Sequence, residues 1–194
     1  MKIIYLIVKY LTVVGTFLQA FFEHLTCRMY NVLIEDGRYL RSNEMCGHIE
    51  HELVKKRATS FGLCFFPFLF NLIIGLILVS VGSVNIYYIG EFFMSSKSNV
   101  PNFANFAFLW VGISCLTNMF PQIEDAMTLK ELIYGKGKSN IFVKIIAAPI
   151  FAILYVGAYF QSFGITLITS VAFSLAMPSS LGTFGPQLYH IIVG

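Results

Sequence analysis

Three side chains that can bind metal lie within four residues of one another, at His48, Glu50 and His51. Imidazole nitrogens and carboxylate oxygens are both zinc ligands, so this segment could form a surface metal site. In a β-strand, however, His48 and Glu50 share one face while His51 points to the other. The favoured interpretation is therefore a solvated strand edge, with metal binding as the alternative.

Two further groups with metal-binding chemistry lie far apart in the sequence. Glu23 and His24 follow the first apolar stretch, and Asp125 comes shortly after Pro121, beyond the third stretch. Glu23 and Asp125 could hold a metal through carboxylate oxygens, or each could pair with a basic residue. The favoured interpretation of Glu23 and His24 is that they are polar residues at the membrane surface. For Asp125 the competing interpretation is a cap of the helix predicted at 126–134.

The composition predicts an integral membrane protein of the α-helical polytopic class. Of the 194 residues, 57% are apolar and only 12% are charged, whereas a soluble domain carries about 25% charged residues. The net charge of +3 is too small to indicate nucleic-acid binding. The four cysteines share no CxxC spacing, so neither a disulfide framework nor a cysteine zinc site is expected.

Residues 1–194 are expected to form a single membrane domain of four or five spans. Apolar stretches long enough to hold them cover residues 3–22, 61–84, 103–120 and 141–177. The first is interpreted as a retained helix rather than a signal peptide, with helical character continuing through Arg28. The last stretch would measure ~55 Å as one helix. It is therefore either a long tilted helix or two segments broken near 157–164.

The polar segment between the first two stretches is expected to form a small surface β-hairpin over about residues 31–51. Residues 32–34 form the predicted first strand, and Asp36-Gly37 is a strong hairpin-turn signal. Tyr39-Leu40 would open the return strand. A second turn at Ser42-Asn43 would lead into residues 46–51.

Basic residues indicate the orientation of the chain in the membrane. Loop 23–60 contains six Lys and Arg residues and loop 121–140 contains three, whereas loop 85–102 contains only Lys97. Because cytoplasmic loops are enriched in Lys and Arg, loops 23–60 and 121–140 are predicted to be cytoplasmic. Lys136 and Lys138 are also candidates for contact with anionic lipid.

Four sequence blocks occur in a recognisable order: FLQAFFEHLTCRMYNV at 17–32, GHIEHE at 47–52, PFLFN at 67–71 and NMFPQIEDA at 118–126. Together they resemble a family of small integral-membrane metalloprotease-like proteins related to the site-two proteases, over about residues 17–133. In that family the first block opens with HExxH, whose two histidines bind zinc and whose glutamate activates the metal-bound water. The Asp of the last block supplies the third ligand.

The resemblance implies the family's fold but a degenerate catalytic site. It aligns the HExxH positions with Gln19, Ala20 and Glu23, and the third ligand with Asp125. Ala20 cannot take a proton, and His24 is about 100° round the helix from the second histidine position. The resemblance also implies that hairpin residues and Asn71 border the former cleft, although a helix-packing hydrogen bond is the competing interpretation for Asn71. The hairpin residues concerned are Gly47, His48 and His51.

The sequence therefore predicts a metalloprotease-like membrane protein that binds a transmembrane partner, or serves as a subunit of a membrane complex, without cleaving peptides. No cofactor is expected under this hypothesis. The first alternative is an active zinc intramembrane protease with an atypical Glu/His/Asp metal set. The second is a small transport or lipid-handling subunit. Membrane lipids and a transmembrane protein are the expected partners.

Overall fold

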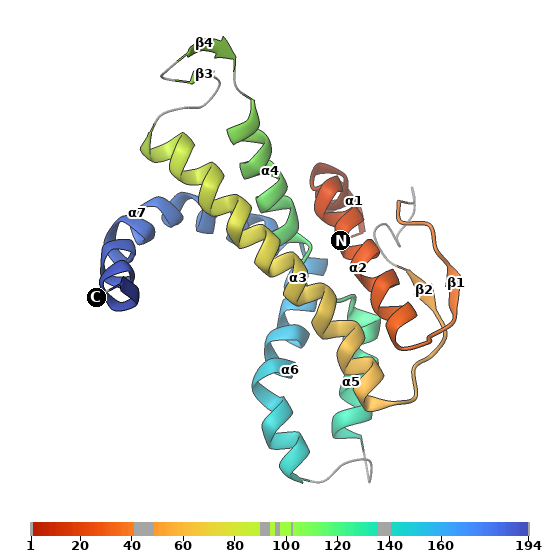
Figure 1. Ribbon diagram of the computed structural model, residues 1–194. Helices are drawn as coiled ribbons and strands as arrows, with labels where there is room; N and C mark the ends of the chain where they lie inside the picture. The colour runs from red at the N-terminus through yellow and green to blue at the C-terminus, as the bar shows by residue number, and fades with distance from the viewer. Residues whose placement is uncertain are drawn as a thin grey trace.

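The computed structural model describes residues 2–40, 49–89, 94–95, 98–101, 103–135 and 141–193. These residues form an assembly of helices with two short antiparallel sheets (Figure 1). In chain order the elements are α1 Lys2–Leu11, α2 Val13–Met29, β1 Ile34–Asp36, β2 Glu50–His51, α3 Arg57–Ser83, the π-helix η1 Val84–Tyr88, β3 Met94–Ser95, β4 Ser98–Pro101, α4 Ala104–Thr117, α5 Ile123–Tyr134, α6 Ile141–Ser162 and α7 Ile165–Val193.

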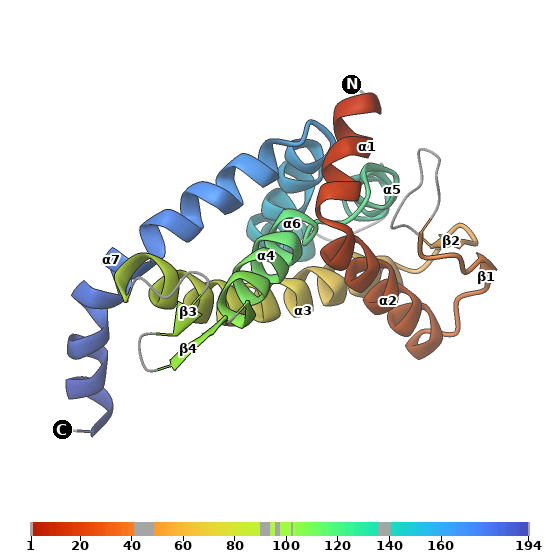
Figure 2. The ribbon, with the colours of Figure 1, turned by 90° about the horizontal axis from the view of Figure 1, so that it is seen from above.

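The centre of the molecule is the long apolar helix α3, against which α2, α4, α5 and α7 pack (Figures 1 and 2). Glycines allow α3 and α4 to approach closely. A Cβ atom on Gly82 would lie 2.6 Å from the backbone nitrogen of Leu109, and one on Gly112 would lie 2.6 Å from that of Val79. Val79 and Leu109 are buried in the core that these helices share.

Within the described part of the chain, three helical segments are long and apolar enough to cross a membrane: Arg57–Tyr87, Lys144–Ser162 and Ile165–Gly182. The bent pair α1–α2 would make a fourth. α4 has 14 residues and measures about 21 Å, less than the ~30 Å hydrocarbon core. The expected span at 103–120 is therefore too short by itself. By length and composition, the described residues hold three candidate spans, or four with the bent pair, instead of the expected four or five.

The first apolar stretch is two helices rather than the single helix expected from the sequence. α1 and α2 meet at an angle of 92° on either side of Thr12. Asn118, just after α4, donates its side-chain N–H groups to the backbone carbonyl of Thr12 at 3.3 Å and to its hydroxyl at 2.7 Å. The Gly15 N–H donates to the Ser114 hydroxyl at 2.7 Å. These partners satisfy polar groups at the break, which would otherwise be costly to bury.

The stretch at 141–177 is broken, as one of the two sequence alternatives proposed. α6 ends at Ser162, and α7 begins at Ile165 and continues to Val193, beyond the expected end. Gly164 has a φ of +75°, a conformation that residues with a Cβ rarely adopt. Glycine at this position therefore allows the chain to turn between the two helices.

The predicted hairpin is confirmed, but with a different return strand. β1 pairs antiparallel with β2, placing Ile34 opposite His51. Tyr39-Leu40 is not part of the described sheet. Asp36 instead accepts hydrogen bonds from the backbone N–H and the guanidinium of Arg38, and the Tyr39 ring packs edge-on against Phe17. The predicted Ser42-Asn43 turn lies outside the described residues.

Candidate metal centre

Three potential metal ligands from distant parts of the sequence meet at one point. Glu23 comes from the second half of α2, His51 from β2 and Asp125 from the first turn of α5. One ligand atom from each lies within 4.8 Å of the other two. The His51 Nε2 atom is 3.4 Å from the Asp125 Oδ1 atom. The approach of Glu23 to Asp125, which the family resemblance implies, is therefore present, with His51 as a third member.

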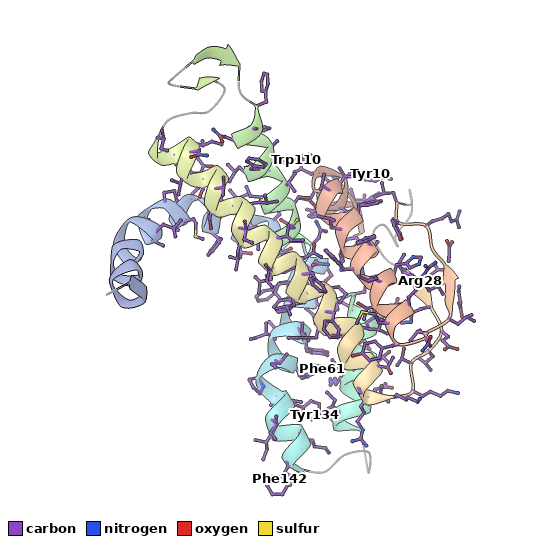
Figure 3. The ribbon with its side chains drawn as sticks, viewed as in Figure 1. Tyr10, Arg28, Phe61, Trp110, Tyr134 and Phe142 are labelled. Atoms are coloured by element: carbon purple, nitrogen blue, oxygen red, sulfur yellow. The ribbon has the colours of Figure 1, made fainter. Side chains whose placement is uncertain are left out.

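Apolar packing brings the hairpin onto α2 and α3. Cys27, one helical turn after Glu23, is fully buried in a cluster with Val54 and Leu63. The hairpin residues Val32 and Ile34 pack against the same cluster. Figure 3 shows the hairpin lying beside the end of α2 that carries the labelled Arg28. This packing places β2, and with it His51, beside Glu23.

A second apolar cluster fixes the position of α5. Leu129 and Ile133 are buried against Cys64 of α3 and Leu154 of α6. With this face of α5 held against α3 and α6, its first turn carries Asp125 to His51. Two separate apolar clusters, one shared by α2 and the hairpin and one that holds α5, therefore position the three elements that contribute the ligands.

Hydrogen bonds with backbone groups orient two of the three ligands. The Ile49 N–H donates to the Oε2 atom of Glu23 at 3.3 Å. The Nδ1 atom of His51 lies 2.9 Å from the Glu52 carbonyl oxygen. Because that carbonyl can only accept, Nδ1 carries the hydrogen and Nε2 faces the carboxylates. Histidine ligands of metal sites are commonly held in this way, with the second ring nitrogen bonded to a carbonyl.

The electrostatic environment favours positive charge at His51. Its side chain is only 8% exposed, and burial opposes protonation. The contact with Asp125, the Glu52 carbonyl and the negative charge of Glu23 outweigh burial and raise the pKa of His51 to about 9. Without a metal, the imidazolium therefore balances part of the carboxylate charge, and a metal ion would have to displace that proton.

The raised pKa of His51 predicts pH-dependent stability of the metal-free protein. The pKa of about 9 exceeds the ordinary value of 6.5, so the protonated ring stabilises the folded state. This contribution is fully present below pH 6.5, declines between pH 6.5 and 9, and is absent above pH 9. In chelator-treated protein, the thermal midpoint of wild type minus that of His51→Gln should fall from pH 6 to pH 10. A difference that stays constant or rises would contradict this assignment.

A cavity of about 170 Å³ adjoins two of the three ligands, since His51 and Asp125 form part of its wall. Apolar or neutral residues such as Leu63 and Thr128 form part of the lining. The rest is strongly acidic and includes Glu35, Glu50, Glu52 and Glu124. The cavity is large enough to hold several water molecules. An ion bound by the three ligands would therefore have room for water in its remaining coordination positions.

Gln19 and Ala20, which occupy the other two HExxH positions, are not part of this cluster of ligands. The side-chain oxygen of Gln19 accepts a hydrogen bond from the Lys9 ammonium at 2.7 Å, and its nitrogen donates to the Phe120 carbonyl at 2.7 Å. Both ends of the amide are therefore engaged in holding α1, α2 and the end of α4 together. Ala20 is fully buried and has no ionisable group.

Other residues considered from the sequence lie elsewhere. The Nδ1 atom of His24 is 3.1 Å from the Tyr39 hydroxyl, so His24 is not one of the three ligands. Asn71 is fully buried and donates to the Asn118 carbonyl at 3.5 Å, which fits the helix-packing interpretation. Gly47 and His48 lie outside the described residues.

Two interpretations of single residues are corrected. Asp125 does not cap α5, because Gln122 occupies the N-cap position and Asp125 lies in the first turn. His51 is not on a solvated edge, because its side chain is buried and its Nε2 atom contacts Asp125 of α5. Strand alternation, which places His51 on the face opposite Glu50, was the sequence signal for its inward orientation.

Comparison with known proteins returns no relative: no protein-family model matches the chain, and no curated protein or solved structure does so. The resemblance to site-two-protease-like proteins therefore stays an expectation based on the four sequence blocks. The functional proposal rests on the geometry of Glu23, His51 and Asp125.

Proposed function

We propose that this chain is an integral membrane protein that binds one divalent metal ion, with zinc the best-fitting ion, through Glu23, His51 and Asp125. We further propose that it does not hydrolyse peptide bonds by the mechanism of the site-two-protease-like class. The observation that carries the proposal is the convergence of three ligand atoms, from α2, β2 and α5, within 4.8 Å of one another.

The donor set suits a zinc ion. Zinc accepts imidazole nitrogen and carboxylate oxygen at about 2.0–2.2 Å, which separates neighbouring ligands of a tetrahedral site by about 3.4 Å. The His51–Asp125 distance of 3.4 Å already has this value. The three ligand atoms lie within 4.8 Å of one another, so side-chain adjustment would have to bring the remaining pairs to this separation. Manganese and iron(II) accept the same donors and are the competing ions.

The absence of a general base at Ala20 supports the non-catalytic part of the proposal. In HExxH enzymes the glutamate at this position takes the proton from the metal-bound water, and such proton transfer contributes about 10²–10⁴-fold in rate. Ala20 is also completely buried, so no neighbouring water has access to it. The bound metal would then stabilise the contacts of the hairpin with α2 and α5.

The proposal also includes an orientation of the chain in the membrane. β2 and α5, which carry His51 and Asp125, lie toward one end of α3, and β3–β4 lies at the other end (Figure 1). α3 is part of the longest candidate span. We therefore propose that the metal centre faces the cytoplasm, as the lysine and arginine distribution indicates. Binding of a transmembrane partner near the hairpin is supported by the family resemblance.

An active hydrolase is the second candidate function, because a carboxylate lies in the cavity wall next to the ligands. Glu124 precedes Asp125 and lines the same 170 Å³ cavity. Glu50 and Glu52, on either side of the ligand His51, line this cavity as well. If the protein is a hydrolase, these three glutamates are the residues to test as a base, beginning with Glu124.

A cleavage assay separates the two functions. Purified zinc-loaded protein in detergent is incubated with transmembrane peptide substrates, beside Asp125→Ala and Glu124→Gln variants that retain the wild-type thermal midpoint. We expect no turnover above that of the Asp125→Ala variant. Metal-dependent cleavage that is lost in Asp125→Ala would overturn the non-catalytic proposal, and its loss in Glu124→Gln would assign the base.

A further inference from the structure

A second cavity, of about 370 Å³, lies between the end of α2 and the start of α3. Tyr30 contributes to its wall from the end of α2, and Lys55, Lys56 and Thr59 contribute from the start of α3. These two helix ends lie side by side (Figure 1), because a Cβ atom on Gly62 of α3 would lie only 2.4 Å from the Tyr30 ring. None of the three proposed metal ligands contributes to the described wall of this cavity.

The first turn of α3 offers hydrogen-bond donors to the cavity. The first N–H groups of a helix have no acceptor within the helix, and Lys56, at the N-cap position of this 27-residue helix, makes no side-chain capping bond. Thr59, in the same turn, is only 9% exposed, and its hydroxyl forms no hydrogen bond with any residue in the described part of the chain. A buried hydroxyl is costly to leave without a partner, so Thr59 indicates a ligand in the cavity that it lines.

The charge at this end of α3 favours an anionic ligand. Lys55, Lys56 and Arg57 are consecutive and exposed, and both lysines line the cavity. The helix dipole adds partial positive charge at the same point. Glu52 is the single carboxylate of the described wall, and its Oε1 atom accepts a hydrogen bond from the Leu33 N–H of the hairpin at 3.4 Å. Positive charge therefore exceeds negative charge around the cavity.

The cavity lies at the level of the lipid headgroups. α3 opens the candidate span Arg57–Tyr87, whose 31 residues would measure about 46 Å, more than the ~30 Å hydrocarbon core. Charged side chains are costly in hydrocarbon, so the basic end of this span extends into the headgroup region. Leu53, in the cavity wall, is 73% exposed and is available to contact an acyl chain. This apolar neighbour favours a lipid over a soluble anion.

We infer that the cavity between α2 and α3 binds the phosphate of an anionic phospholipid, through Lys55, Lys56, Thr59 and the N–H groups that begin α3. Helix N-termini bind phosphate well, and lysine binds it as a point charge. Anionic lipids are concentrated in the cytoplasmic leaflet. The inference therefore rests on the membrane orientation proposed above, but not on the metal centre.

Native mass spectrometry of the full chain in detergent, titrated with phosphatidylglycerol or phosphatidylcholine, tests the inference. Lys55→Gln and Lys56→Gln should each bind phosphatidylglycerol about fivefold more weakly than wild type, the effect of one lysine near an anionic surface. Thr59→Val should weaken binding about tenfold, the effect of a hydrogen bond to a charged acceptor. The matched control is Lys130→Gln, which removes an exposed lysine outside the cavity.

Thr59→Val also separates lipid binding from a structural role, because valine keeps the shape of threonine and removes only the hydroxyl. Since this hydroxyl has no partner among the described residues, its removal should leave the thermal midpoint without lipid unchanged or higher. A lower midpoint would show that the hydroxyl is bonded within the protein, and would overturn its assignment to the lipid.

Selective loss of phosphatidylglycerol binding in the three cavity variants, with retention in Lys130→Gln, supports the site. Equal binding of phosphatidylcholine and phosphatidylglycerol by wild type would overturn it, as would unchanged binding in both lysine variants. Complete displacement of the lipid by inorganic phosphate at the same concentration would show that the site recognises free phosphate, and the lipid assignment would be wrong. The zinc affinity of the variants, measured separately, distinguishes failure of this site from failure of the metal centre.

Discussion

Replacing Asp125 with alanine should lower the affinity of the purified protein for Zn²⁺ by about a hundredfold or more, since loss of a partner outside the ligand shell alone costs 10–100-fold. Asp125 approaches His51 to 3.4 Å and contributes one of the three converging ligand atoms. His51→Ala should have a similar effect. Competition with a chromogenic chelator in detergent measures both affinities.

The neighbouring acidic residue provides a matched control for this prediction. Glu124 carries the same charge as Asp125 and lies on the same helix, α5, but it is not among the three ligands. Glu124→Ala should leave zinc affinity within a fewfold of wild type, since it changes only the long-range charge of the cavity. Equal losses in Asp125→Ala and Glu124→Ala would mean that general negative charge, not coordination, attracts the ion.

Gly15→Ala should prevent accumulation of folded protein. An added Cβ at position 15 would lie 1.9 Å from the carbonyl oxygen of Ser114 and 2.8 Å from the backbone nitrogen of Cys115. These are backbone atoms, so the clash can be relieved only by moving α2 away from α4. Such movement would also break the 2.7 Å bond from the Gly15 N–H to Ser114. Overpacking of this kind costs about 1–3 kcal/mol, and loss of the buried hydrogen bond adds a similar amount.

Gly182→Ala is the matched control, because nothing lies within 4 Å of a Cβ atom at that position. Size-exclusion profiles and thermal midpoints of the two variants in the same detergent measure the difference. A Gly15→Ala protein with the profile and midpoint of Gly182→Ala would show that α2 and α4 do not pack as described.

The positions of most helices follow from the apolar stretches, but their breaks do not. The long stretch at 61–84 predicts α3 well, because a long apolar helix needs only local hydrogen bonds. The 92° bend at Thr12 depends on Asn118, more than 100 residues later, and no local pattern contains that contact. The short length of α4 likewise depends on where its C-terminus meets this bend.

The candidate metal centre could likewise be predicted only in part from the sequence. Glu23 and Asp125 were predicted as neighbours because the sequence blocks resemble a known arrangement of helices. The choice of His51 over His24 as the third ligand depends on the packing of the hairpin against Cys27 and Val54. That packing joins residues far apart in the sequence, so it could not be predicted. The sequence indicated only that His24, one residue out of phase on α2, does not occupy the second histidine position of HExxH.

X-ray absorption spectroscopy of the purified, metal-loaded protein, combined with elemental analysis, tests the proposed metal centre most directly. We expect one zinc ion per chain, coordinated by nitrogen and oxygen at about 2.0–2.2 Å, with one imidazole and no sulfur. The His51→Ala variant should lack the imidazole signal. A chain that retains no metal beyond that of the Asp125→Ala variant, or a sphere dominated by sulfur at about 2.3 Å, would contradict the Glu23–His51–Asp125 centre.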